Sequence, residues 1–161
     1  MGLFQSHVGY CSCAGVARLR SLAKAITVYS LAHATLALKV ASETGQPVLL
    51  ISAPFAAGTT GPAWFNSVVS QAMDAVPDAD VTSMLDCGNM AGFAMASLRQ
   101  GIKYIRFDGE TFDKIANIAE QLKARVTNER PDSLDLYALE LQGKQLDDAC
   151  KNWLLDLYLM L

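Results

Sequence analysis

Short apolar runs alternate with longer segments of helical spacing through most of this chain. The run PVLLISA at 47–53 is continuously apolar, which is typical of a strand covered on both faces. The segment before it has helical spacing and ends at a glycine, a residue that often terminates helices. The same pattern predicts strands at 25–31, 47–53, 80–86 and 102–108, and helices at 32–44, 61–76, 90–101 and 111–126.

These elements make four consecutive β–α units, and that order predicts the fold class. Strands that are separated by helices run parallel, because a parallel pair needs a crossover connection. We therefore expect an α/β domain of four parallel β–α units over 21–126, after an irregular lead-in at 1–20. The glycine-rich loop FAAGTTG follows the second strand. It lacks the lysine of GxxxxGK[ST] and does not fit GxGxxG, so we expect a plain loop rather than a phosphate cradle.

After Val126 the alternation stops, and 127–133 has the composition of a linker. We expect Ser133 to cap a short helix that ends at Leu141. A last helix is predicted from about Gln145 to the end of the chain, within a C-terminal segment at 132–161. This helix is apolar nearly all round, so we expect it to be buried.

The sequence leaves two alternatives for the surface on which this last helix packs. One is the chain's own sheet, and the other is another subunit. If it docks on another subunit, the expected interface residues are Trp153, Leu154, Leu157, Tyr158 and Leu161.

Composition narrows the classes of partner. Hydrophobic residues make up 52% of the chain and charged residues 18%, with a net charge of −3 and no basic block. Binding to nucleic acid or to an anionic membrane is therefore not expected. The apolar content favours a sheet covered on both faces, or a large interface in a homo-oligomer or with a protein partner.

The cysteines and the N-terminus predict a cytoplasmic protein. No Lys or Arg precedes an apolar run at the N-terminus, as a secretory signal would require. Cys11 and Cys13 form CxC, and no second pair follows at zinc-finger spacing. We therefore expect reduced thiols.

Polar side chains follow the predicted strands at their carboxyl ends, where parallel β–α folds place their reactive groups. Ser52, Asp86, Cys87 and Asp108 are the candidate ligand-binding residues at this rim. Like-charge repulsion between Asp86 and Asp108 would suit one of them for general acid or base catalysis. The alternative for either aspartate is that it caps the helix that follows, and for Asp108 the turn-like sequence FDGETF favours this alternative.

Cys87 has two interpretations. A nucleophilic cysteine needs a histidine base, and a metal site needs further ligands. His33 opens the first predicted helix just after a strand, so it is the candidate partner at the same rim. The alternative is a buried and inert thiol.

Two stretches together resemble a known family. They are ALKVASETGQPVLLISA at 37–53 and VTSMLDCGNMAGFAMASLRQGIKYIRFDGE at 81–110. They resemble the first half of the class II, zinc-dependent ketose-bisphosphate aldolases. Members of that family typically show ETGSPV, LDHG and SVMFDGS where this chain has ETGQPV, LDCG and YIRFDGE. The resemblance extends over about 25–123.

The resemblance implies half of a TIM-type barrel, because the family folds as a barrel of eight β–α units. It places Asp86 at the position of the family's proton-transferring aspartate, and Cys87 at that of the first zinc-binding histidine. The family's other zinc ligands and its phosphate-binding loops lie in the second half of the barrel. Nothing after Val126 resembles that half.

Three functions are therefore considered. We expect a non-catalytic, aldolase-derived half-barrel protein that acts by self-assembly or partner binding and needs no cofactor. The first alternative is a lyase of the aldolase type, with Asp86 as acid or base, Asp108 as a second catalytic carboxylate, and zinc held by Cys87 and His33. The second alternative is a sensor that keeps the rim as a sugar-phosphate site.

Overall fold

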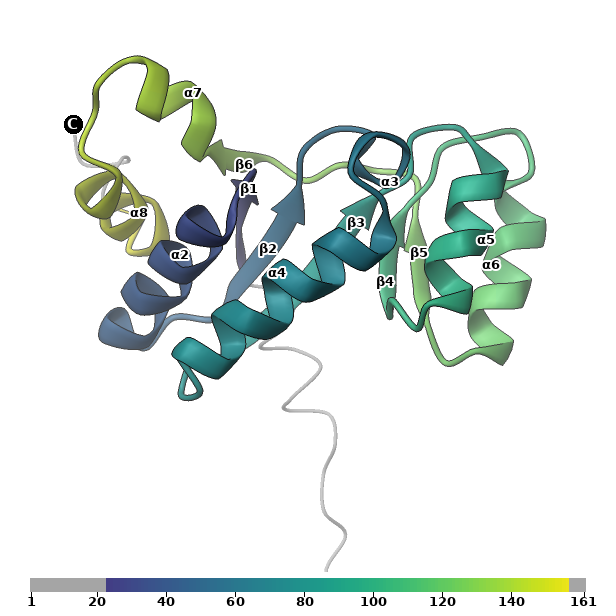
Figure 1. Ribbon diagram of the computed structural model, residues 1–161, viewed down its shortest axis with the longest axis horizontal. Helices are drawn as coiled ribbons and strands as arrows, with labels where there is room; N and C mark the ends of the chain where they lie inside the picture. The colour runs from purple at the N-terminus through teal and green to yellow at the C-terminus, as the bar shows by residue number, and fades with distance from the viewer. Residues whose placement is uncertain (1–22, 157–161) are drawn as a thin grey trace, which may run out of the picture.

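The computed structural model describes residues 23–156, in which a six-stranded parallel sheet has the order β5-β4-β3-β2-β1-β6 (Figure 1). The strands are β1 (Lys24–Val28), β2 (Val48–Ser52), β3 (Val81–Asp86), β4 (Tyr104–Arg106), β5 (Arg125–Thr127) and β6 (Ser133–Asp135). The helices are α2 (Leu31–Thr44), α3 (Ala56–Thr59), α4 (Pro62–Ala75), α5 (Ala91–Arg99), α6 (Phe112–Gln121), α7 (Leu136–Leu141) and α8 (Leu146–Leu154). The predicted α/β class and the four parallel β–α units are confirmed, and two strands come in addition. This arrangement fits a half-barrel; the lead-in predicted at 1–20 lies outside the described residues.

Local signals explain where the predicted helices begin and end. The Ser30 hydroxyl accepts a hydrogen bond from the His33 N–H at 3.2 Å and so caps the start of α2. Gly45 ends the same helix with a φ of +64°, a left-handed conformation that costs glycine little. Pro62 begins α4, where its missing N–H would have had no partner in the helix.

The helix predicted at 111–126 is shorter than its pattern suggested. It ends at Gln121, and Lys123 takes a left-handed φ of +53° that turns the chain back toward the sheet. Residues Arg125–Thr127 then pair with β4 as strand β5. The helical prediction beyond 121 was therefore wrong.

The prediction that Ser133 caps a helix was also wrong. Asp135 caps α7 instead, since its carboxylate accepts a hydrogen bond from the Ala138 N–H at 3.0 Å. Ser133 lies in β6, where its hydroxyl is 2.8 Å from the Thr27 hydroxyl of β1. The side chain is thus engaged across the sheet rather than with the helix.

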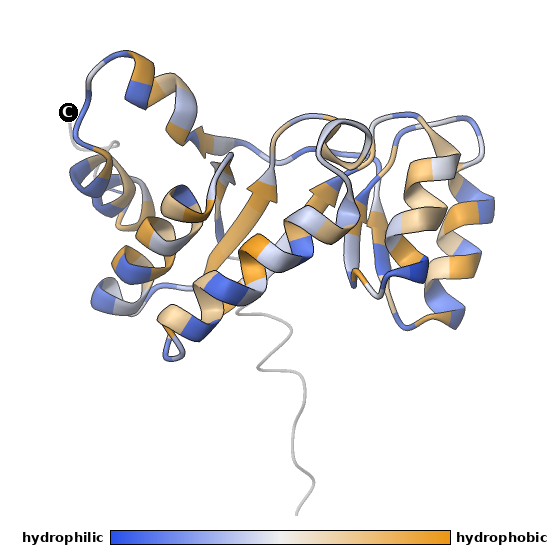
Figure 2. Ribbon diagram, viewed as in Figure 1, coloured by the Kyte–Doolittle hydropathy of each residue, from blue (hydrophilic) through white to orange (hydrophobic). Residues whose placement is uncertain are grey.

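The sheet has two different faces, because successive residues of a strand point to opposite sides. One face packs on the helices and carries the main core, with Ile26, Leu50, Leu85 and Ile105 fully buried. The opposite face, here called the inner face, carries a small separate apolar cluster around Ala25, Ile51 and Met84. Figure 2 shows the apolar colouring along β2, in the middle of the sheet.

A five-residue link at 128–132 joins the two opposite edges of the sheet, from β5 to β6. Six Cα–Cα steps separate Thr127 from Ser133, which an extended chain covers in about 20–22 Å. A flat sheet would need about 24 Å for five interstrand spacings. The sheet must therefore curl, and the link passes over the inner face, where Glu129 and Pro131 line a hollow with Leu49, Thr82 and Tyr104.

Helices α7 and α8 pack on the chain's own β1 and α2. Leu154 is buried there, and the Trp153 Nε1–H donates to the Ala25 carbonyl at 2.8 Å. The sequence left two partners open for this segment, the chain's own sheet and another subunit. Trp153 and Leu154 pack on the chain itself. The other three predicted interface residues, Leu157, Tyr158 and Leu161, lie outside the described residues. Within 23–156, no helix has the length and apolar character needed to cross a bilayer.

Candidate functional site

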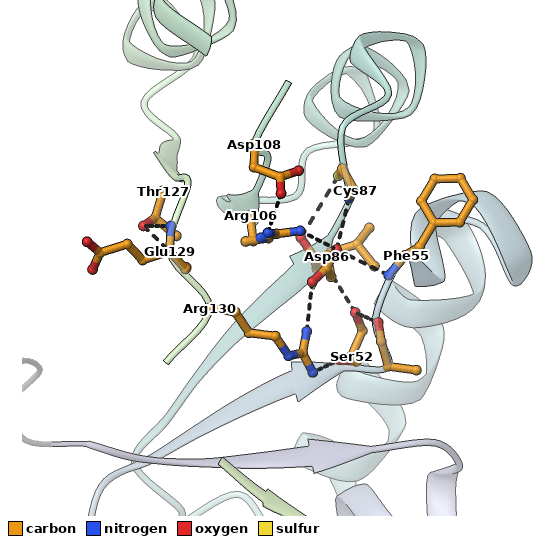
Figure 3. A network of polar contacts seen from close by, with 12 residues as sticks. Ser52, Phe55, Asp86, Cys87, Arg106, Asp108, Thr127, Glu129 and Arg130 are labelled. Atoms are coloured by element: carbon orange, nitrogen blue, oxygen red, sulfur yellow. Dashed lines mark hydrogen bonds and ion pairs between the residues drawn. The ribbon is translucent and has the colours of Figure 1, made fainter. Parts of the chain in front are cut away.

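Asp86 is the centre of a polar network at the carboxyl end of β3 (Figure 3). Its side chain lies on the inner face and is only 1% exposed. One carboxylate oxygen accepts the N–H groups of Phe55 at 3.1 Å and Gly88 at 2.8 Å. The other accepts an N–H of the Arg130 guanidinium at 2.8 Å. Both oxygens of this candidate catalytic group are therefore already engaged within the chain.

Arg130 reaches Asp86 from the link that crosses the inner face (Figure 3). Its second terminal nitrogen donates to the Ser52 carbonyl at 2.8 Å and to the Thr27 hydroxyl at 3.2 Å. One guanidinium thus connects β1, β2 and β3 to the link. A planar group with five donors suits this role, because it satisfies several acceptors without changing its geometry.

Arg106 lies between the two predicted rim carboxylates. It stands beside Asp86 in the sheet register, with 3.5 Å between Nη1 and the Asp86 carboxylate. Its Nη2 contacts the Asp108 carboxylate at 2.5 Å, and Asp108 itself is 40% exposed. The repulsion expected between Asp86 and Asp108 is therefore offset by the cation between them.

The Ser52 hydroxyl bonds to main-chain groups of the network and is not free to bind a ligand. It accepts the Asp86 N–H at 2.9 Å and donates to the Ala53 carbonyl at 3.0 Å. The residue is fully buried. Ser52 fixes the position at which Asp86 leaves the sheet.

Cys87 faces the opposite side of the sheet from Asp86. The strand period of two requires this, since the two residues are neighbours on one extended segment. The Cys87 Sγ is fully buried in the main core and lies 3.5 Å from the Ser97 hydroxyl of α5. Burial, with a contribution from Asp86, raises the pKa of this thiol to about 11. The thiol is therefore protonated at neutral pH, and it does not share the rim with Asp86.

His33 is held by other partners. Its Nδ1 accepts the Tyr29 N–H at 3.4 Å, which leaves the proton on Nε2, 3.2 Å from the Glu140 carboxylate. Among residues 23–156, no three His, Cys, Asp or Glu side chains gather closely enough to hold a metal ion. A zinc site built on Cys87 and His33 does not fit this arrangement, because Cys87 is buried against Ser97 of α5 whereas His33 faces Glu140 of α7.

A hollow of about 500 Å³ opens beside the network at the rim. Arg106 and Asp108 supply its charged groups, and Phe55 and Met90 supply apolar surface. Phe55 has a φ of +55°, which is uncommon for a bulky side chain and is typical of strained functional or tightly packed sites. Its ring meets the Phe93 ring edge-on, with 5.5 Å between centroids. The hollow can accept a small molecule with polar groups and an apolar side.

The pattern of strands and helices did not indicate the two arginines of this network. Arg106 could have been predicted from the sequence, because aligning the carboxyl ends of the predicted strands places it beside Asp86. Arg130 offered no such signal, since it lies in a segment of linker composition.

The comparisons with known proteins add no family to this geometry. No protein-family model matches the chain, and a search of curated proteins found none that matches it.

Proposed function

We propose that this chain is a non-catalytic half-barrel protein, derived from an aldolase-like ancestor, that acts by assembling with itself or by binding a protein partner. The observation that carries the proposal is the Arg130–Asp86 contact across the inner face. It places a cation of the chain itself on the carboxylate that the resemblance assigns to proton transfer.

Proton transfer to a substrate needs a carboxyl group within hydrogen-bond reach of that substrate. Asp86 is 1% exposed and covered by Arg130, so a substrate reaches it only if the link moves away. Moving the link also breaks the Arg130 contacts to Ser52 and Thr27. The arrangement therefore favours a structural role for Asp86.

An assay of aldol cleavage tests the absence of catalysis. We expect no cleavage of a ketose bisphosphate above the buffer rate, with or without added zinc, for the natural chain and for Arg130→Ala, which uncovers Asp86. Arg99→Ala is the matched control, because Arg99 is exposed on α5. Cleavage that disappears in a folded Asp86→Asn variant would contradict the proposal.

Light scattering tests the assembly. We expect a mass of at least twice the 17.3 kDa of one chain at concentrations where folded protein is stable. A single-chain mass at every concentration would leave only a different protein as partner, and would contradict self-assembly.

The rim hollow supports a second candidate, a sensor for sugar phosphates. Arg106 is the group there that would meet a phosphate, with the exposed Asp108 carboxylate opposing it. A rise in melting temperature with a sugar phosphate that is lost in Arg106→Ala would favour the sensor. An equal rise in both proteins would exclude binding through Arg106.

A further inference from the structure

Residues 133–156, here called the C-terminal arm, form one edge of the sheet and the two helices that follow it. The arm comprises β6, α7 and α8, and outside itself it packs mainly on β1 and α2. Only the link at 128–132 connects it to β5, at the other edge of the sheet. Without the arm, β1 would present an unpaired edge.

The link is short for the sheet that it crosses, because its five residues join the two outermost of six strands. It must cover the opening of the curled sheet with about 20–22 Å of extended backbone. Asn128 and Glu129 are exposed, and among residues 23–156 the Glu129 hydrogen bonds go to the nearby Thr127 hydroxyl alone. Short connections to a terminal element favour exchange of that element between identical chains.

The contacts that hold the arm are the same whichever copy supplies it. Each contact joins one group of β1, of α2 or of Tyr29 between them to one group of the arm, so it needs only the local register. These contacts are Thr27–Ser133, Tyr29–Asp135, His33–Glu140, Ala25–Trp153 and Lys24–Asp156.

Four of the seven large apolar side chains that are exposed among the described residues lie on the arm or at the start of α2, a region here called the seam. Tyr137 and Leu141 on α7 are 47% and 71% exposed, and Leu155 at the end of α8 is 37% exposed. Leu31, at the start of the α2 helix on which the arm packs, is 39% exposed. A second copy placed along the seam would bury surface of this kind.

We propose that two copies of this chain exchange their C-terminal arms, so that β6 of each copy pairs with β1 of the other. The inference rests on the proposed function, of which it names the partner and the surface. Arg130 lies only three residues before β6, so it moves with the arm and meets Asp86 of the accepting copy. Asn128 and Glu129 are then the hinge, and each candidate site contains an arginine from the other copy.

A cysteine pair tests the exchange directly. Thr27→Cys with Ser133→Cys, in a background with Cys11→Ser and Cys13→Ser, replaces two hydroxyls that are 2.8 Å apart. After refolding at high protein concentration and oxidation, we expect a covalent dimer of twice 17.3 kDa on a non-reducing denaturing gel. A dimer by light scattering that yields only disulfide-closed single chains would overturn the exchange and leave self-assembly standing.

The single variants Thr27→Cys and Ser133→Cys are the controls, and neither should give the covalent dimer. A second test changes the hinge and leaves the core intact. Inserting Gly-Ser-Gly between Asn128 and Glu129 should lower the dimer fraction severalfold, and deleting these two residues should raise it. If neither the insertion nor the deletion alters the dimer fraction, the exchange is contradicted. This test stands even if the double-cysteine variant does not fold.

Discussion

Arg130 binds the Asp86 carboxylate from within the same chain. The contribution of this ion pair to the free energy of unfolding can be measured. Removing one partner of a buried ion pair leaves a buried charge without compensation, which usually costs several kcal/mol. Arg130 itself keeps 23% of its side chain exposed, which lowers the loss.

We expect Arg130→Ala to lower the free energy of unfolding by about 2–3 kcal/mol. Urea denaturation measures this, with Arg99→Ala on the surface of α5 changing it by less than about 0.5 kcal/mol. A change for Arg130→Ala as small as for Arg99→Ala would mean that the link does not depend on its arginine.

The two described cysteines should be unreactive in the folded state. Burial raises the pKa of Cys87 to about 11 and that of Cys150 to about 12, and both thiols are buried. In a Cys11→Ser, Cys13→Ser background, a disulfide reagent at pH 8 should therefore react only at the rate of unfolding. Fast labelling of Cys87 before unfolding would instead support a reactive thiol.

At the scale of elements, the sequence predicted the strands that lie in runs long enough to show a pattern. The first three strands have five or six residues each and read as apolar runs. β4 has three residues but lies in the longer run IKYIRFD at 102–108, whereas β5 and β6 have three residues each and no such run around them. They form because the curled sheet offers β4 and β1 as neighbours, which is tertiary information.

The same limit explains which candidate residues were correctly placed at the strand ends. Asp86, Ser52 and Asp108 do lie at the carboxyl ends of their strands or just beyond. Cys87 was placed at the same rim although alternation along a strand already sends it to the other face. Arg130 depends on the path of the link, which no local pattern encodes.

Gly88, in the loop between β3 and α5, and Gly92, in α5, offer a matched pair of substitutions. Gly88 has a φ of +56°, and a Cβ there would lie 2.8 Å from the Phe55 ring, whereas a Cβ on Gly92 in α5 meets nothing within 4 Å. Gly88→Ala should cost about 1–3 kcal/mol, and Gly92→Ala should add about 0.5–1 kcal/mol. Thermal or urea unfolding of the two variants measures the difference, and equal effects would contradict the close approach of Phe55.

At the scale of the whole molecule, stability should decline in alkali. Burial and the neighbouring Asp135 carboxylate raise the pKa of Tyr29 from 10.0 to about 12, and the buried thiols shift in the same direction. The folded state therefore holds these protons more tightly than the unfolded state. Their stabilising contribution is complete below about pH 9 and is lost as the pH rises toward 12.

Urea midpoints between pH 8 and pH 11 measure this decline. In Tyr29→Phe the part of the decline above pH 10 should become shallower, because phenylalanine has no proton to lose. An unchanged slope in that variant would show that Tyr29 is not protected in the way its contact with Asp135 implies.

The position of β1 between β2 and β6 has a mechanical consequence. The first described strand is an interior strand, clamped on both sides by parallel ladders. A force that pulls on the chain just before Lys24 must shear both ladders together, whereas a strand at the rim of a sheet can be peeled from one neighbour at a time. The amino-terminal end of the domain is thus anchored on both sides, and its last strand supplies the shorter of the two ladders.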